Sequence, residues 1–158
     1  MFALLIGIDE YRDKSLNLKG AVADCRNMKE FLEKNLQEVH IEWLLNENAT
    51  RKGIKKAIND LANHSRIKEF GDPILIYYAG HGAEILPQEA WNLPHSTSKI
   101  QMILPHDFIR HPTQGSDEGR GLFDRTLSDL LARLSYHKGD NIVSVVFFRT
   151  SDRHFIPV

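Results

Sequence analysis

DPILIYYAGHGAE, residues 72–84, is the stretch that decides the fold. Its apolar part, Ile74–Ala79, follows the turn signal Gly71-Asp72-Pro73 and predicts a buried strand. Gly80-His81-Gly82 comes directly after this strand, so His81 lies between two glycines, which permit unusual backbone angles and close approach. An imidazole at the carboxyl end of such a strand suits a general base. Gly-His-Gly alone fits an ordinary loop histidine equally well, so the rest of the chain has to decide.

The rest of the chain alternates predicted strands and helices. Apolar runs predict strands at Phe2–Ile8, His40–Leu45 and Asn141–Phe148, with a short one at Ile100–Leu104. Helical spacing predicts one helix over Val22–Leu36, a second that begins after Thr50 as its N-cap, and a third from Asp124 or Thr126 to Leu134. This order predicts an α/β fold with a mainly parallel sheet and helices on both faces. Functional side chains are then expected just after Ile8, Ala79 and Phe148.

Composition excludes several classes of protein. The 158 residues, 42% of them apolar, are enough for one domain with a substantial core. Lys+Arg at 20 balances Asp+Glu at 21, which argues against nucleic acid or an anionic membrane as a partner. The single cysteine, Cys25, excludes an internal disulfide and predicts a reducing, cytoplasmic setting. The first apolar run stops at Asp9, too soon for a signal peptide or a membrane span.

Five segments together resemble a known family. They are ALLIGIDEY (3–11), GAVADCRNMKEFL (20–32), DPILIYYAGHGAE (72–84), ILPHDF (103–108) and DRTLSDLLARL (124–134). Their order and approximate intervals are similar to those of the caspase-like, metacaspase-type cysteine peptidase domains of fungi and plants. The resemblance covers residues 1–146 and implies a three-layer α/β caspase-like fold, incomplete at its C-terminus. It also implies endopeptidase activity on peptide or protein substrates, with a role in programmed cell death.

The resemblance assigns roles to two residues around the central glycines. In that family a cysteine thiolate attacks the peptide carbonyl, a histidine acts as acid and base, and backbone amides hold the oxyanion. By resemblance, His81 is the acid/base and the amide of Gly82 is one oxyanion donor. The chemistry needs such groups because an imidazole raises the thiolate fraction of a nearby thiol, and aimed amides stabilise the transition state.

The nucleophile itself is missing. It belongs to an Asp-Cys-Cys-His-Ser-Gly pattern at the end of the next core strand, and alignment on Asn141-Ile142 puts Arg149 at the cysteine position. A guanidinium stays protonated in proteins and cannot be that nucleophile. Residues 147–158 resemble nothing in the family and form a predicted non-family tail, in which Ser151 is interpreted as a solvated residue. We therefore expect this chain to be inactive.

Two explanations of the tail remain open. A frameshift, alternative splice or mispredicted exon is one, and a true pseudopeptidase is the other. The second would act as a non-catalytic interaction module, a homo- or hetero-oligomer formed through an exposed strand edge. A flavodoxin-like domain is not expected, because IDEYRDKSLNL, residues 8–18, is not a glycine-rich phosphate loop.

Asp24 and Cys25 lie on the first predicted helix. Asp24 resembles the acid that, with the aspartate of the cysteine motif, makes metacaspase pockets select Arg or Lys; the alternative is an ordinary acid in the first helical turn. Its expected partner position is occupied by Phe147. Cys25 lies on the predicted core face and is assigned a structural role.

No cofactor is required by the resemblance, but calcium activates some metacaspases. Asp107 and Asp124 are the candidate ligands, with Asp117 and Glu118 nearby, although exposed loop acids are the simpler interpretation. Three further histidines share no paired ligand spacing with cysteine and are interpreted as loop residues: His95, His106 and His111.

Overall fold

The computed structural model describes residues 1–68, 71–85, 99–110 and 119–150. Its strands are β1 (Phe2–Gly7), β2 (His40–Leu45), β3 (Ile74–Ile85), β4 (Ile100–Ile103), β5 (Leu122–Phe123) and β6 (Ile142–Thr150). Its α-helices are α1 (Ala21–Asn35), α2 (Arg51–Asn63) and α3 (Asp124–Lys138), and short 3-10 helices lie at Lys14–Leu16 and Asn46–Asn48. The predicted alternation is confirmed, with β5 as an element that the sequence did not predict.

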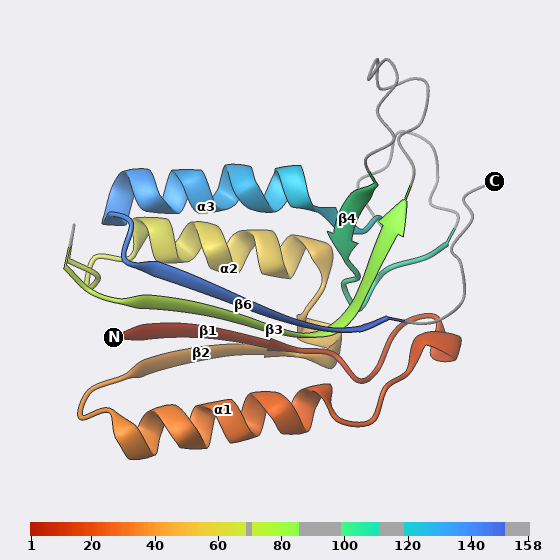
Figure 1. Cartoon of the computed structure of the whole chain (residues 1–158), viewed down its shortest axis with the longest axis horizontal. Helices are drawn as coiled ribbons and strands as arrows, with labels where there is room; N and C mark the ends of the chain where they lie inside the picture. Colours follow the sequence, from red (N-terminus) through yellow and green to blue (C-terminus); the bar gives the residue numbers. More distant parts are fainter. Residues whose placement is uncertain (69–70, 86–98, 111–118, 151–158) are drawn as a thin grey trace.

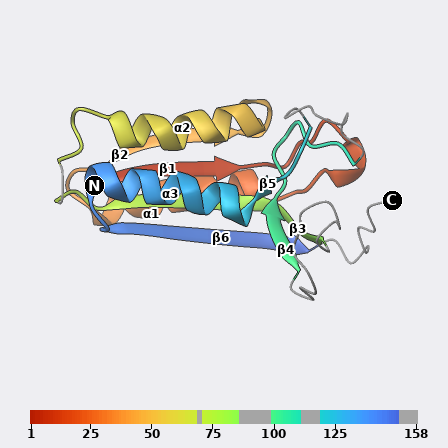
Figure 2. The same ribbon diagram turned by 90° about the horizontal axis from the view of Figure 1, so that it is seen from above.

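The sheet is parallel at its centre and antiparallel at one end. The strand order is β2-β1-β3-β4-β5, and β6 pairs in parallel with the other edge of β3. β1 pairs with the first half of β3, up to Ala79, and β4 pairs antiparallel with Gly82–Ile85. β3 is therefore the strand that joins both parts, and Figures 1 and 2 show its end turning toward β4.

The helices lie on both faces, which gives the predicted three layers. α1 covers one face, while α2 and α3 lie side by side on the other (Figure 1). All six residues of β1 are buried because both of its faces are covered. β2, at an edge, is more exposed along its length. No helix in the described ranges is long and apolar enough to cross a bilayer.

The start of α1 is held by Asp9, which lies in the loop after β1. Its Oδ1 accepts hydrogen bonds from the backbone N–H groups of Gly20 and Ala21, both at 2.8 Å, and its Oδ2 accepts one from Val22 at 3.1 Å. Gly20, the N-cap residue, has no side chain that could do this. The carboxylate satisfies orphan donors and complements the helix dipole, so it fixes the loop that follows β1 to the helix.

The start of α2 uses two caps from different parts of the chain. The Thr50 side chain accepts from the N–H of Gly53 at 3.0 Å, which confirms the predicted cap. Asp107 adds a second, because its Oδ1 accepts from the N–H of Arg51 at 2.8 Å. The segment after β4 is thereby tied to α2.

Three expectations from the sequence need correction. β3 does not end at Ala79 but continues to Ile85, because β4 and β6 pair with its second half, so His81 lies inside a strand. β6 likewise runs beyond Phe148 to Thr150. The apolar spacing that predicts the first helix includes Phe31 and Leu36, but both are exposed, because α1 covers the sheet with the face that carries Cys25 and Leu32.

Candidate active site around His81

His81 is a buried residue of β3 whose imidazole contacts a backbone carbonyl. Its Nε2 lies 2.9 Å from the carbonyl oxygen of Leu16, and the residue is 6% exposed. A carbonyl oxygen can only accept a hydrogen bond, so Nε2 carries the proton. The neutral ring then has its lone pair on Nδ1, which is the nitrogen that could receive a proton from a thiol.

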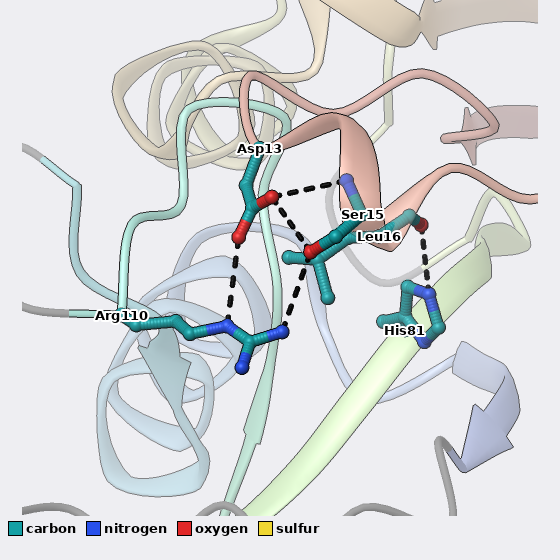
Figure 3. A network of polar contacts seen from close by, with 5 residues as sticks. All are labelled: Asp13, Ser15, Leu16, His81 and Arg110. Carbon is teal, nitrogen blue, oxygen red and sulfur yellow. Dashed lines mark hydrogen bonds and ion pairs between the residues drawn. The ribbon is translucent and has the colours of Figure 1, made fainter.

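The loop that supplies the Leu16 carbonyl is itself held by side chains, as Figure 3 shows. Asp13 Oδ1 accepts from the backbone N–H of Ser15 at 3.0 Å and from its hydroxyl at 2.7 Å. Arg110 Nε lies 3.5 Å from Asp13 Oδ2, and another guanidinium nitrogen donates to the Ser15 hydroxyl at 3.3 Å. The Ser15 hydrogen bonds, and after them the charge of Arg110, lower the pKa of Asp13.

Two buried tyrosines contact the backbone of His81. Tyr11, in the loop after β1, accepts from the His81 N–H through its hydroxyl oxygen at 2.8 Å. The Tyr78 hydroxyl donates to the carbonyl oxygens of His81 at 2.8 Å and Leu104 at 3.0 Å. The Tyr11 ring also packs against the imidazole, with ring centroids 5.3 Å apart.

Position 149 lies beside His81 in the sheet. In the parallel pairing of β3 and β6, the Cα partner of His81 is Arg149, with Phe147 opposite Ala79 and Thr150 opposite Gly82. The site to which sequence alignment assigns the nucleophile is therefore the immediate neighbour of the candidate acid/base. Ser151 lies outside the described residues.

Asp24 lies on the other face of the sheet from the tyrosine pair. It is an exposed acid in the first turn of α1. Burial raises the pKa of Tyr77, with smaller electrostatic contributions from Cys25 and Asp24. The Tyr77 ring in turn contacts Phe147, with centroids 5.7 Å apart. Asp24 thus lies near Tyr77. Tyr77 also contacts Phe147, which occupies the position where the resemblance expects a second acid.

The other predicted site residues are dispersed. Gly82 is buried next to His81, with Ile103 and Thr150 as its Cα partners, and its role as an oxyanion donor stays a prediction. Asp107 caps α2, and Asp124 is exposed in the first turn of α3. Within the described ranges no group of three His, Cys, Asp or Glu residues could hold a metal ion.

The remaining histidines and acids of those predictions are only partly described. His106 Nδ1 lies 2.6 Å from the carbonyl oxygen of Glu10, so it belongs to the loop packing. The rest lie outside the described residues: His95, His111, Asp117 and Glu118. Cys25 is buried, as predicted.

Sequence reasoning missed Leu16, Tyr11 and Tyr78 as parts of the site. Leu16 acts through its backbone, which leaves no signal in the residue type. Tyr11 and Tyr78 looked like ordinary aromatic residues at strand ends. The one available signal was a hydroxyl predicted to be buried, because a buried tyrosine hydroxyl usually finds a hydrogen-bond partner.

Known proteins are similar to this chain in sequence and in fold. A family model described as "Caspase domain" matches residues 1–126. The chain is 24% identical over 143 residues to Metacaspase-3 of Arabidopsis thaliana, and the match covers 85% of this chain and 35% of that protein. A Geobacter sulfurreducens protein of known crystal structure is similar with a TM-score of 0.66 at 20% identity, over 94% of this chain and 49% of that one. The chain spans about a third of the plant relative and half of the bacterial one. By its sequence, the chain belongs to the caspase-domain family.

Proposed function

We propose that this chain carries the acid/base half of a cysteine endopeptidase site and has no nucleophile, so that it does not hydrolyse peptides by itself. One observation supports this most: the register partner of His81 on β6 is Arg149, where the family motif would place cysteine. In an intact domain, His81 would take the thiol proton on Nδ1 while Leu16 holds the proton on Nε2.

The electrostatic difference between cysteine and arginine at position 149 supports inactivity. A thiolate beside an imidazolium forms an ion pair that lowers the thiol pKa, whereas a guanidinium has no lone pair available for attack on a carbonyl. The chemistry that the family's histidine serves is therefore missing at this position.

A peptidase assay tests the proposal. Purified protein is incubated with a fluorogenic peptide that has Arg at P1, beside a basic-specific cysteine peptidase as a positive control. We expect no turnover above that of a His81→Ala variant. Turnover by the wild-type chain that His81→Ala abolishes would overturn the proposed inactivity.

For intact relatives we propose cleavage after Arg or Lys, with Asp24 as one acid of the pocket. Asp24 supports this because its charge reaches Tyr77, which contacts Phe147 at the place of the second acid. A lone carboxylate binds a cationic side chain less tightly than a pair does. Titration with an arginine peptide, monitored by NMR chemical shifts, would test this role. Chemical-shift changes that are lost in Asp24→Asn would support it.

Calcium binding, a cytoplasmic location and a part in programmed cell death stay predictions. For calcium, Asp107 already accepts a hydrogen bond from Arg51 at the start of α2, so binding there would compete with a helix cap. A calcium-dependent rise in melting temperature, lost in Asp107→Asn and Asp124→Asn, would support the site. Absence of any shift at millimolar calcium would count against it.

A non-catalytic interaction module is the second candidate, and the exposed apolar side chains of β6 favour it. Val143, Val146 and Phe147 are 56%, 42% and 58% exposed. Within the described part of the chain, β6 pairs only with β3. A soluble chain that unfolds cooperatively and binds a specific partner, with binding lost in Phe147→Ser, would support the module; an insoluble chain would count against it.

A further inference from the structure

The backbone of His81 is bonded on both sides to tyrosine hydroxyls, in a part of the site that the proposed chemistry does not itself use. The Tyr11 hydroxyl oxygen accepts a hydrogen bond from the His81 N–H, and the Tyr78 hydroxyl donates one to the His81 carbonyl oxygen, each at 2.8 Å. The two tyrosines reach it from different segments, the loop after β1 and β3 itself. Such an arrangement fixes the orientation of the peptide units on either side of one residue.

The glycine before His81 makes this approach possible. A Cβ at position 80 would lie 2.5 Å from the Tyr78 hydroxyl and 3.0 Å from the Tyr11 hydroxyl. Real Cβ atoms do not come so close to other heavy atoms, so any larger residue would push the hydroxyls away. Gly80 therefore serves the contact between the tyrosines and His81.

The two tyrosine hydroxyls stay protonated at neutral pH. Burial raises the pKa of Tyr11 to about 12 and that of Tyr78 well above its ordinary value. The bonds of both hydroxyls to the His81 backbone are therefore made by neutral groups.

The same residues fix what the imidazole contacts. The Tyr11 backbone N–H donates to Asn17 Oδ1 at 2.9 Å, and Asn17 directly follows Leu16, whose carbonyl contacts His81 Nε2. Tyr11 therefore couples the backbone of His81 to the loop that determines its tautomer. Loss of the Tyr11 hydroxyl would release the His81 end of this connection, while the backbone bond to Asn17 would remain.

We propose that Tyr11 and Tyr78 are positioning residues, whose hydroxyls hold the His81 backbone so that its Nε2–H stays on the Leu16 carbonyl. This rests on the proposed role of His81. The tyrosines contact no reacting atom and act only through His81. Tyr77 provides a matched control, because it neighbours Tyr78 on the same strand but packs with Cys25 and Leu32 on the α1 face.

Nitrogen-15 NMR of the imidazole tests the proposal on the wild-type chain and on Tyr11→Phe, Tyr78→Phe and Tyr77→Phe, with His81→Gln to assign the signals. Phenylalanine keeps the ring and removes only the hydroxyl. We expect an Nε2–H tautomer in the wild type and in Tyr77→Phe. In Tyr11→Phe and Tyr78→Phe the tautomer ratio should fall by about fivefold, the effect of an ordinary hydrogen bond. An unchanged ratio in both folded variants would mean a merely structural role and would overturn the proposal.

A second measurement, on the wild-type chain, tests the proposal even if the tyrosine variants do not fold. Hydrogen exchange of the His81 amide in the wild-type chain should be strongly protected, because Tyr11 is its acceptor. Rapid exchange would contradict the proposal. The proposed function can fail separately from the positioning role. If His81 does not activate a thiol introduced by Arg149→Cys, the peptidase role is refuted, and the tautomer result still stands. Activation of that thiol with an unmoved tautomer would refute only the positioning role.

Discussion

The Cα atoms of His81 and Arg149 are partners in the parallel pairing of β3 and β6. His81 and position 149 are therefore neighbours near the carboxyl edge, where α/β proteins gather functional groups. This pairing is the basis of our proposal that the site has kept its histidine and changed its nucleophile position.

Asp9 should stabilise the whole domain through the start of α1. Because its carboxylate accepts from three backbone N–H groups, Asp9→Ala should lower the free energy of unfolding by about 2 kcal/mol. Chemical denaturation monitored by circular dichroism measures this. Glu10→Ala removes an adjacent exposed acid and should cost less than about 0.5 kcal/mol. Equal effects of the two substitutions would contradict the capping role.

Gly80→Ala should destabilise the chain by about 1–3 kcal/mol, because its Cβ would meet the Tyr78 and Tyr11 hydroxyls. Tyr78→Phe removes the nearest clashing oxygen but leaves the ring carbon Cζ, which would lie 2.8 Å from the added Cβ. The double variant should therefore lose somewhat less stability than the sum of the single variants. Strict additivity in the double-mutant cycle would show that the Tyr78 hydroxyl is not the group that Gly80 accommodates.

The thiol of Cys25 should be inert in the folded chain. Burial, followed by the charges of Asp24 and Asp9, raises its pKa to about 12. At about pH 8.5 a free thiol is half ionised, so iodoacetamide should label the folded chain at least about a hundredfold more slowly than the urea-unfolded chain.

The same shift fixes the pH dependence. A raised folded pKa means that the unfolded chain loses its thiol proton first. Stability from Cys25 is therefore present below the ordinary thiol pKa of about 8.5 and is lost as the pH rises above it. Cys25→Ala should remove this alkaline loss, and fast labelling of the folded chain would refute the assignment.

Asp13 should contribute to the free energy of unfolding with a pH dependence opposite to that of Cys25. Its pKa is lowered, so its stabilisation is present above the ordinary value of 3.8 and is lost as the pH falls below it. Because Asp13 is near the surface, Asp13→Ala should cost only about 0.5–1 kcal/mol at neutral pH. That difference from the wild type should shrink in acid. A difference that stays constant with pH would show that the charge of Asp13 is not involved.

The fold could be predicted well from local pattern. β1 and the first half of β3 are continuous apolar runs buried on both faces, and α2 carries the Thr50 cap that the sequence indicated. The end of β3 could not be predicted, because pairing with β4 and β6 extends the strand through glycines that usually end one. β5 has only two residues, too few for any periodicity.

Candidate site residues could be proposed from the sequence where a side chain would carry the chemistry and not where the backbone would. The glycines and the strand around it make His81 a candidate, whereas the Leu16 carbonyl leaves no signal in the sequence. Long-range contacts were equally hidden: Asp9 caps α1 and Asp107 caps α2 from distant loops. Asp107, whose role as a calcium ligand stays a prediction, also caps α2, a contact that spacing alone does not reveal.

The most direct test asks whether His81 acts on position 149. In Arg149→Cys the introduced thiol is titrated by its rate of alkylation against pH, with the wild-type chain giving the background of Cys25. We predict a thiol pKa at least one unit below the ordinary value of about 8.5, returning to that value in Arg149→Cys/His81→Ala. A thiol pKa that is the same with and without His81 would contradict the account.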